Sequence, residues 1–210
     1  MRKVSLKLFG ILSCLMILAT LPTFAQNEIN KKPLQDSADN LNQKLEKGEV
    51  DLTKPFSVTL EGYLTKEGKF DIKRSRFTKS EGDRQMVEVV KQAIEAVSDS
   101  GMLSYLQQFG IEKVIVNISQ DDKNVAAVIT SELPTVAKAK TIVSGFNVFF
   151  QMAKINVKEE TEKTLLNAAK VSSQDKNFII NFAMPKEEVH QLLKNELQKA
   201  KEKSYSNKVN

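Results

Sequence analysis

Hydrophobic and polar residues follow two different periods along this chain, and the clearest helical pattern lies over residues 134–154. Its apolar residues recur every three or four positions, so they form one wide stripe along a helix. The members of this stripe are Ala139, Ile142, Val143, Phe146, Phe149, Phe150 and Ala153. We therefore expect residues 134–154 to form the central core helix, with Pro134 in its first turn and Ser131 as the nearby capping residue.

Shorter helices are predicted before this one. The first ends at Gly48, because glycine readily adopts the left-handed conformation found after a helix C-terminus. The second is opened by Asp83, which follows Ser80 at capping-box spacing, and it stops at Gly101. A short connecting helix is expected over residues 102–109.

The strand-forming period of two appears between these helices. Residues 56–64 alternate apolar and polar side chains, and a glycine-containing turn leads to a second run at 70–75. Together they predict a β-hairpin with one solvated face. Since Phe77 falls on the opposite parity, the second strand should end or bulge near residues 73–75. Residues 114–129 predict another hairpin, more apolar and therefore more central in the sheet.

The last third of the chain returns to mixed patterns. Residues 158–170 predict an amphipathic helix, residues 178–182 a final strand, and Pro185 the start of a last helix. From the first hairpin onward the order of elements is ββα(α)ββααβα. We therefore predict an α+β fold, in which an antiparallel sheet of about five strands carries helices mainly on one face.

The N-terminal residues carry an export pattern. Its parts are the basic residues Arg2, Lys3 and Lys7, an apolar run from Leu8 to Leu21, and the small-x-small motif Thr23-Phe24-Ala25. This pattern predicts a signal peptide over residues 1–25 that is cleaved after Ala25. The protein is then expected to be periplasmic or secreted.

Two alternatives to a cleaved signal peptide agree less well with the sequence. An uncleaved membrane anchor needs about 20 apolar residues to cross the hydrocarbon region, and this run is shorter. A lipoprotein would use Cys14 in Leu12-Ser13-Cys14, but the apolar run continues for seven residues beyond that cysteine. Cleavage after Ala25 is therefore the preferred reading, and no stable membrane span is expected after it.

Removal of the signal peptide changes the composition. Loss of its three basic residues leaves 28 basic against 26 acidic residues, so the net charge falls from +5 to +2. No nucleic-acid partner is implied by such a balance. The only cysteine is lost as well, which leaves no disulfide and no thiolate. We expect a disordered leader at residues 26–35, one domain at 36–200 and a flexible lysine-rich tail at 201–210.

Patterns for catalysis and metal binding are missing from the sequence. The single histidine, His190, has no partner at metal-ligand spacing, and Asp121-Asp122 lacks the further oxygen ligands of a calcium loop. No phosphate-binding glycine loop is present. We therefore predict a non-enzymatic protein without cofactor or metal. A hydrolase stays open, because Glu61 and Asp71 could meet across the first hairpin.

Five basic residues are interleaved with Phe70 and Phe77 in the region of the first hairpin. They are Lys69, Lys73, Arg74, Arg76 and Lys79. Interleaved basic and aromatic residues can bind an anionic polymer. Export directs this prediction towards lipid head groups, acidic polysaccharide or an acidic protein surface rather than nucleic acid. The alternative is a solvated edge strand protected by lysine residues.

Ser144 and Gly145 place two small residues in the middle of the phenylalanine-rich helix. Small residues either admit the close approach of another backbone or leave space for an apolar guest. The residues that would line such a pocket are Phe146, Phe149, Phe150 and Phe178. With export and no catalytic set, the leading hypothesis is a cell-envelope binding or interaction protein of bacterial type. The alternative is a carrier of a hydrophobic ligand or lipid in this pocket.

The first hairpin and the helix after it occur in an order that one known family shares. The parts are an alternating strand from Phe56, a charged turn at Glu67-Gly68, an acid-led helix from Asp83 to Val97, and a third strand at Val114 to Ile118. On these features, residues 56–119 resemble the C-terminal domain of energy-transducing TonB proteins. The resemblance implies an envelope interaction module, and it transfers no functional residue.

Overall fold

One antiparallel sheet organises the part of the chain that the structure describes, which is residues 29–157 and 159–195 of a computed structural model. Its strands are β1 (Phe56–Tyr63), β2 (Arg76–Gly82), β3 (Lys113–Gln120), β4 (Asn124–Glu132), β5 (Ala169–Gln174) and β6 (Asn177–Pro185). They pair in the order β2-β1-β3-β4-β6-β5. The predicted signal peptide and the predicted tail lie outside the described residues.

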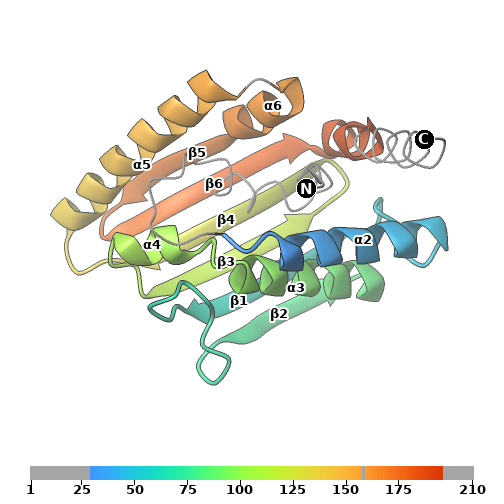
Figure 1. Ribbon diagram of the computed structural model, residues 1–210, viewed down its shortest axis with the longest axis horizontal. Coiled ribbons are helices and arrows are strands. Elements are labelled where there is room, and N and C mark those ends of the chain that lie inside the picture. Colours follow the sequence, from blue (N-terminus) through green and yellow to red (C-terminus); the bar gives the residue numbers. More distant parts are fainter. Residues whose placement is uncertain (1–28, 158, 196–210) are drawn as a thin grey trace.

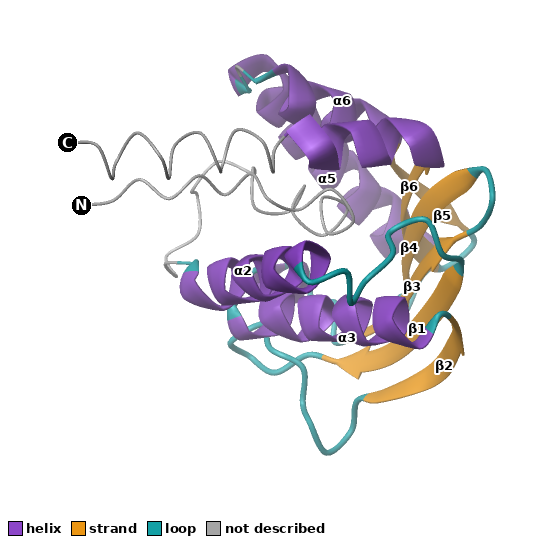
Figure 2. Ribbon diagram, turned by 90° about the vertical axis from the view of Figure 1, so that its right-hand side faces the viewer, coloured by secondary structure: helices purple, strands orange, loops and turns teal. Residues whose placement is uncertain are grey.

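The helices lie on one face of this sheet. They are α2 (Lys32–Glu46), α3 (Arg84–Asp99), α4 (Ser104–Gln108), α5 (Val136–Asn156) and α6 (Glu160–Ala168), and residues 186–195 are also helical. Figure 1 shows α3 over the β1–β2 side and α5 over the β5–β6 side, in agreement with their close contacts. Figure 2 shows the opposite face of the sheet without a covering helix. The predicted α+β architecture is confirmed.

Alternation of side chains places the core between the sheet and the helices. In β1, Phe56, Val58 and Leu60 are buried while the residues between them are partly exposed. The same alternation runs through β3, β4 and β6. The stripe predicted for the central helix meets this surface, since Phe146 of α5 and Phe178 of β6 are fully buried. A period of two in strands and of 3.6 in helices therefore determines which residues face the core.

The second strand of the first hairpin lies further along the chain than the sequence pattern predicts. The partner of β1 is β2, and residues 70–75 form a turn in which Ile72 is 92% exposed. The Asp71 carbonyl oxygen accepts the Ser75 backbone N–H at 2.8 Å and closes this turn. The prediction of a strand over residues 70–75 is wrong. The irregularity lies at Thr78, where the register with β1 shifts.

Strand β5 is absent from the sequence prediction, which assigns residues 158–170 to one helix. Helix α6 instead ends at Ala168 and β5 begins at the next residue, so the sheet has six strands. An edge strand covered on one face needs few apolar residues, and Val171 is the one large apolar residue in β5. Its pairing with β6 therefore decides its conformation.

Helix ends agree with the prediction at two places and differ at two others. Asp83 caps α3, since its side chain accepts the Met86 backbone N–H at 3.0 Å, and Gly48 has the predicted left-handed φ of 68°. The cap of α5 is Thr135 rather than Ser131, because the Thr135 hydroxyl accepts the Lys138 N–H at 3.1 Å. Helix α2 begins at Lys32, within the predicted leader, and its Leu34 is fully buried.

Candidate interaction surfaces

The candidate catalytic and metal-binding residues have structural partners. His190 Nε2 lies 2.9 Å from the Leu52 carbonyl oxygen, and its Nδ1 lies 4.0 Å from the Glu187 carboxylate. Asp121 accepts the backbone N–H groups of Lys123 and Asn124, both at 2.7 Å, and so closes the β3–β4 turn. Within the described residues, no three His, Cys, Asp or Glu side chains gather to hold a metal ion.

Glu61 and Asp71, the carboxylates considered for a hydrolase, have separate partners. The Glu61 carboxylate lies 2.6 Å from Lys113 Nζ and 3.1 Å from Arg76 Nη2. Asp71 accepts the Lys73 backbone N–H at 3.0 Å. Hydrogen bonds from Lys113 and then Arg76 lower the pKa of Glu61. A general acid needs a raised pKa, so this environment does not favour that role for Glu61.

The ion pairs of Glu61 lead to a prediction for acid stability. Because the folded state lowers the Glu61 pKa, ionised Glu61 stabilises the fold above its unfolded pKa of about 4. This contribution is lost as the pH falls through the lower folded value. We expect Glu61→Gln to lower the thermal midpoint slightly at pH 7 and to match the wild type at low pH. Thermal unfolding followed by circular dichroism between pH 7 and about pH 2 measures the difference.

The control is Glu188→Gln, because Glu188 is exposed and takes part in no ion pair found among the described residues. Its difference from the wild type should not change with pH in this way. A Glu61→Gln deficit that persisted at low pH would contradict the ion-pair explanation.

The face of the sheet away from the helices, called here the open face, has an uncharged centre. Three aligned rows run across β3, β4 and β6. The rows are Ile115, Thr130 and Ile179; Asn117, Val128 and Asn181; and Ser119, Ala126 and Ala183. We call these nine residues the central patch. None of them carries a charge, and five are apolar.

Charges on the open face lie around the central patch. Arg76, Lys79 and Glu81 are on the edge strand β2, and Lys170 is on the other edge strand, β5. Glu61 of β1 lies directly opposite Ile115 on the same face and pairs with Lys113 of β3. Inside this boundary, Ile115 is 45% exposed. A protein interface typically has such a charge-depleted centre and a polar rim. The sequence pattern did not reveal the central patch, because its rows combine residues from strands that are far apart along the chain.

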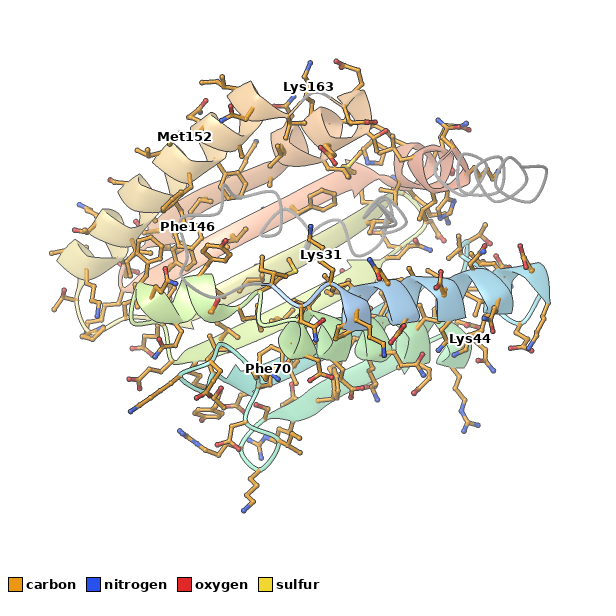
Figure 3. All side chains as sticks on the ribbon, in the orientation of Figure 1. Lys31, Lys44, Phe70, Phe146, Met152 and Lys163 are labelled. Carbon is orange, nitrogen blue, oxygen red and sulfur yellow. The ribbon has the colours of Figure 1, made fainter. Side chains whose placement is uncertain are left out.

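Three of the four phenylalanines predicted to line a pocket have ring contacts with one another or with a further ring, that of Phe109. Phe146 is fully buried, and its ring centre lies 4.9 Å from that of Phe109 and 5.0 Å from that of Phe178. Phe150 is buried, whereas Phe149 is half-buried and meets Phe109 edge-on at 6.1 Å. Figure 3 shows Phe146 among the side chains between α5 and α4.

The sequence pattern does not include Phe109 among the pocket residues. The one indication of a bulky neighbour is Gly145, a small residue in the phenylalanine-rich helix. A Cβ atom added at Gly145 would lie 3.3 Å from the Phe109 ring, so the ring occupies the space beside this glycine. The aromatic packing accounts for a small residue at this position. Binding of an apolar guest stays a prediction.

The five basic residues of the predicted anionic surface fall into two groups. Arg76 and Lys79 lie on β2 and form ion pairs with Glu61 and Glu81, at 3.1 and 3.0 Å. This arrangement fits the alternative of a charged, protected edge strand. Lys69, Lys73 and Arg74 lie instead in the connection between β1 and β2 and are exposed. The Arg74 guanidinium is 4.2 Å from the centre of the Tyr63 ring.

Exposed apolar side chains also occur on α5. Val148, Met152 and Ile155 follow one another at helical spacing and are 60%, 37% and 81% exposed. Figure 3 labels Met152 on this outer side of the helix. Among the described residues, no helix combines the length and the apolar character needed to cross a bilayer.

Comparison with known proteins identifies no relative of this chain. The chain was compared with protein-family models, with curated proteins and with solved structures, and none of the three comparisons finds a match. The resemblance of residues 56–119 to the TonB C-terminal domain therefore stays a prediction. Within the described residues, the open face and the β1–β2 connection are the candidate binding surfaces.

Proposed function

We propose that this chain is an exported, non-catalytic interaction protein of the bacterial cell envelope that binds a folded protein partner through the open face of its sheet. The observation that carries the proposal is the uncharged central patch. The solvent-exposed face of an antiparallel sheet usually carries polar and charged residues. Here three neighbouring strands carry no charge over three successive rows, and Ile115, which borders Glu61 of β1, is 45% exposed.

The size of the open face supports a protein as the partner. Six strands about 4.8 Å apart, with about eight residues each rising about 3.4 Å, cover roughly 700–800 Å² in projection. Each partner in a standard protein interface buries about 800 Å². A charged polysaccharide or a nucleic acid would instead need cations at the centre of the surface, where the central patch has none.

Export is supported by the N-terminal pattern of basic, apolar and small residues. The test is expression of the full chain in a bacterium, followed by cell fractionation and mass spectrometry of the product. We expect a mature protein in the periplasm or medium that begins at Gln26. Ile17→Arg places a charge in the apolar run and should hold the chain in the cytoplasm. Unprocessed wild-type protein in the cytoplasm would contradict export.

The interaction is tested by photo-cross-linking in living cells. A benzoylphenylalanine residue at Ile115 lies in the central patch, whereas the same residue at Lys140 of α5 is exposed on the helical side. We expect a discrete adduct from position 115 and none from position 140. Val128→Lys should abolish the adduct from position 115, because a charge at the centre of an interface is costly to desolvate.

Equal adducts from both positions, or an adduct that survives Val128→Lys, would contradict docking at the central patch. An adduct of twice the chain's mass would identify the partner protein as a second copy. Circular dichroism of each variant verifies that its fold is retained.

A further inference from the structure

The connection between β1 and β2, residues 64–75, carries an apolar side chain in an unusual position. Figures 1 and 2 show this segment projecting beyond the rest of the sheet. Its Ile72 is 92% exposed, more than the other exposed large hydrophobic residues of the described chain. Single exposed apolar residues are common on protein surfaces, so exposure alone proves little. A binding role for Ile72 requires in addition an ordered turn that presents it and neighbouring side chains suited to a partner.

Hydrogen bonds hold the turn that presents Ile72. The Asp71 side chain accepts the Lys73 N–H at 3.0 Å, and the Asp71 carbonyl oxygen accepts the N–H groups of Arg74 and Ser75 at 3.2 and 2.8 Å. The Asp71 N–H donates to the Tyr63 carbonyl oxygen at 2.8 Å and so attaches the turn to β1. The exposure of Ile72 is therefore built into an ordered turn.

The base of the connection is anchored to the core. The Phe70 N–H donates to the Ser98 hydroxyl of α3 at 2.8 Å. The Phe70 ring lies against Gly62 of β1, where an added Cβ would overlap this ring. This packing explains why Phe70 is turned towards the protein while Ile72, two residues later, is turned away from it.

Basic residues flank the exposed isoleucine along the chain. Residues 65–75 contain four basic residues and two acidic ones, Glu67 and Asp71. Asp71 is engaged in the turn through its hydrogen bond to the Lys73 N–H. Lys69, Lys73 and Arg74 are exposed. Residues 69–74, called here the tip, thus combine one protruding apolar side chain with a net positive charge.

We propose that this tip docks on an anionic lipid bilayer, with Ile72 entering the interfacial region and Lys69, Lys73 and Arg74 contacting lipid phosphates. An anionic polymer would satisfy the cations but would offer no apolar phase to Ile72. A bilayer offers both, since anionic head groups attract basic residues and the acyl boundary accepts apolar side chains. The tip borders the open face, because the Arg74 guanidinium lies 4.2 Å from the ring centre of Tyr63 at the end of β1. Docking of Ile72 on a bilayer does not rest on the function proposed for the open face.

The absence of tryptophan from the sequence allows a direct test. Ile72→Trp places a single indole at the tip, and Ile155→Trp places one at a matched apolar position on α5 that is 81% exposed. Each purified chain is titrated with vesicles of pure phosphatidylcholine and with vesicles containing phosphatidylglycerol. We expect a blue shift of the emission from position 72 with the anionic vesicles only. Raising the salt concentration should reverse it, and position 155 should show no shift.

Vesicle co-sedimentation then separates the apolar contribution of Ile72 from the electrostatic contribution of the basic residues. These variants are made in the chain without an introduced tryptophan. Ile72→Ser should weaken partitioning to anionic vesicles about tenfold, since it removes most of the apolar contact. Lys73→Glu combined with Arg74→Glu should weaken it at least as much, because attraction becomes repulsion. Lys170→Glu on β5 makes a charge reversal away from the tip and should leave partitioning nearly unchanged. The N-terminal sequence is the same in all variants, so differences among them report on the tip.

Three results would overturn the proposal. Equal blue shifts at positions 72 and 155 would show non-specific adsorption. Equal binding to neutral and anionic vesicles would exclude the role of the cations. Binding to heparin, with no shift at position 72 on any vesicle, would identify the tip as a site for anionic polymers. Unchanged thermal midpoints for the variants exclude unfolding as the cause of lost binding.

Discussion

Replacing Phe146 with alanine is expected to lower the free energy of unfolding by about 3–5 kcal/mol. The Phe146 side chain is fully buried, and its ring packs between those of Phe109 and Phe178 at centroid distances of 4.9 and 5.0 Å. Alanine at this position leaves a cavity bordered by two aromatic rings, which can close only in part. Urea denaturation followed by circular dichroism measures the change.

Phe149→Ala is the matched control on the same helix. Phe149 is half-buried and contacts Phe109 at 6.1 Å, so its removal should cost roughly 1–2 kcal/mol. A loss at Phe146 no greater than that at Phe149 would mean that the ring does not fill a packed core. The same measurement bears on the alternative of a hydrophobic carrier, because a stable Phe146→Ala chain that lost a co-purifying lipid would favour a pocket.

Replacing Gly68 with alanine is expected to destabilise the fold by about 2–5 kcal/mol. Gly68 has a φ of 72°, a left-handed conformation that costs a residue with a Cβ about 1–2 kcal/mol. An added Cβ would also overlap the backbone of Leu103 and Ser104, at the start of α4. Backbone atoms cannot move aside as a flexible side chain can. Denaturant unfolding again provides the measurement.

Gly48→Ala separates the two costs. Gly48 has nearly the same φ, 68°, and an added Cβ there meets no atom within 4 Å. This variant should therefore lose only the conformational part, about 1–2 kcal/mol. Equal losses of unfolding free energy at both positions would show that the close contact between the β1–β2 connection and the start of α4 adds no cost to the Gly68 substitution. Since the same connection presents Ile72, a Gly68→Ala chain that folds should also bind anionic vesicles less well.

The helical and strand periods were readable from the sequence because they reflect local backbone geometry. The stripe over residues 134–154 predicts α5, and the alternation over residues 114–129 predicts β3 and β4. Asp83 and Gly48 mark helix ends through interactions within a few residues of each. Features that depend on neighbours in sequence were therefore predicted with few errors.

The errors occur where a distant partner decides the conformation. Residues 70–75 continue the alternation of β1 well enough to suggest a strand, but Phe70 is anchored to Ser98 of α3 and the chain turns at Asp71. Strand β5 has too few apolar residues to be recognised, and pairing with β6 forms it. Both are contacts between segments that sequence patterns treat separately.

The sequence by itself determined the class of fold, the faces of its helices and central strands, and the lack of recognisable catalytic or metal-binding patterns, because composition and period are local properties. Only the tertiary structure decided the central patch and the exposure of Ile72. Asn117, Val128 and Asn181 form one row because β3, β4 and β6 are neighbours in the sheet. Strand order depends on long-range hydrogen bonding and packing, which no local pattern specifies.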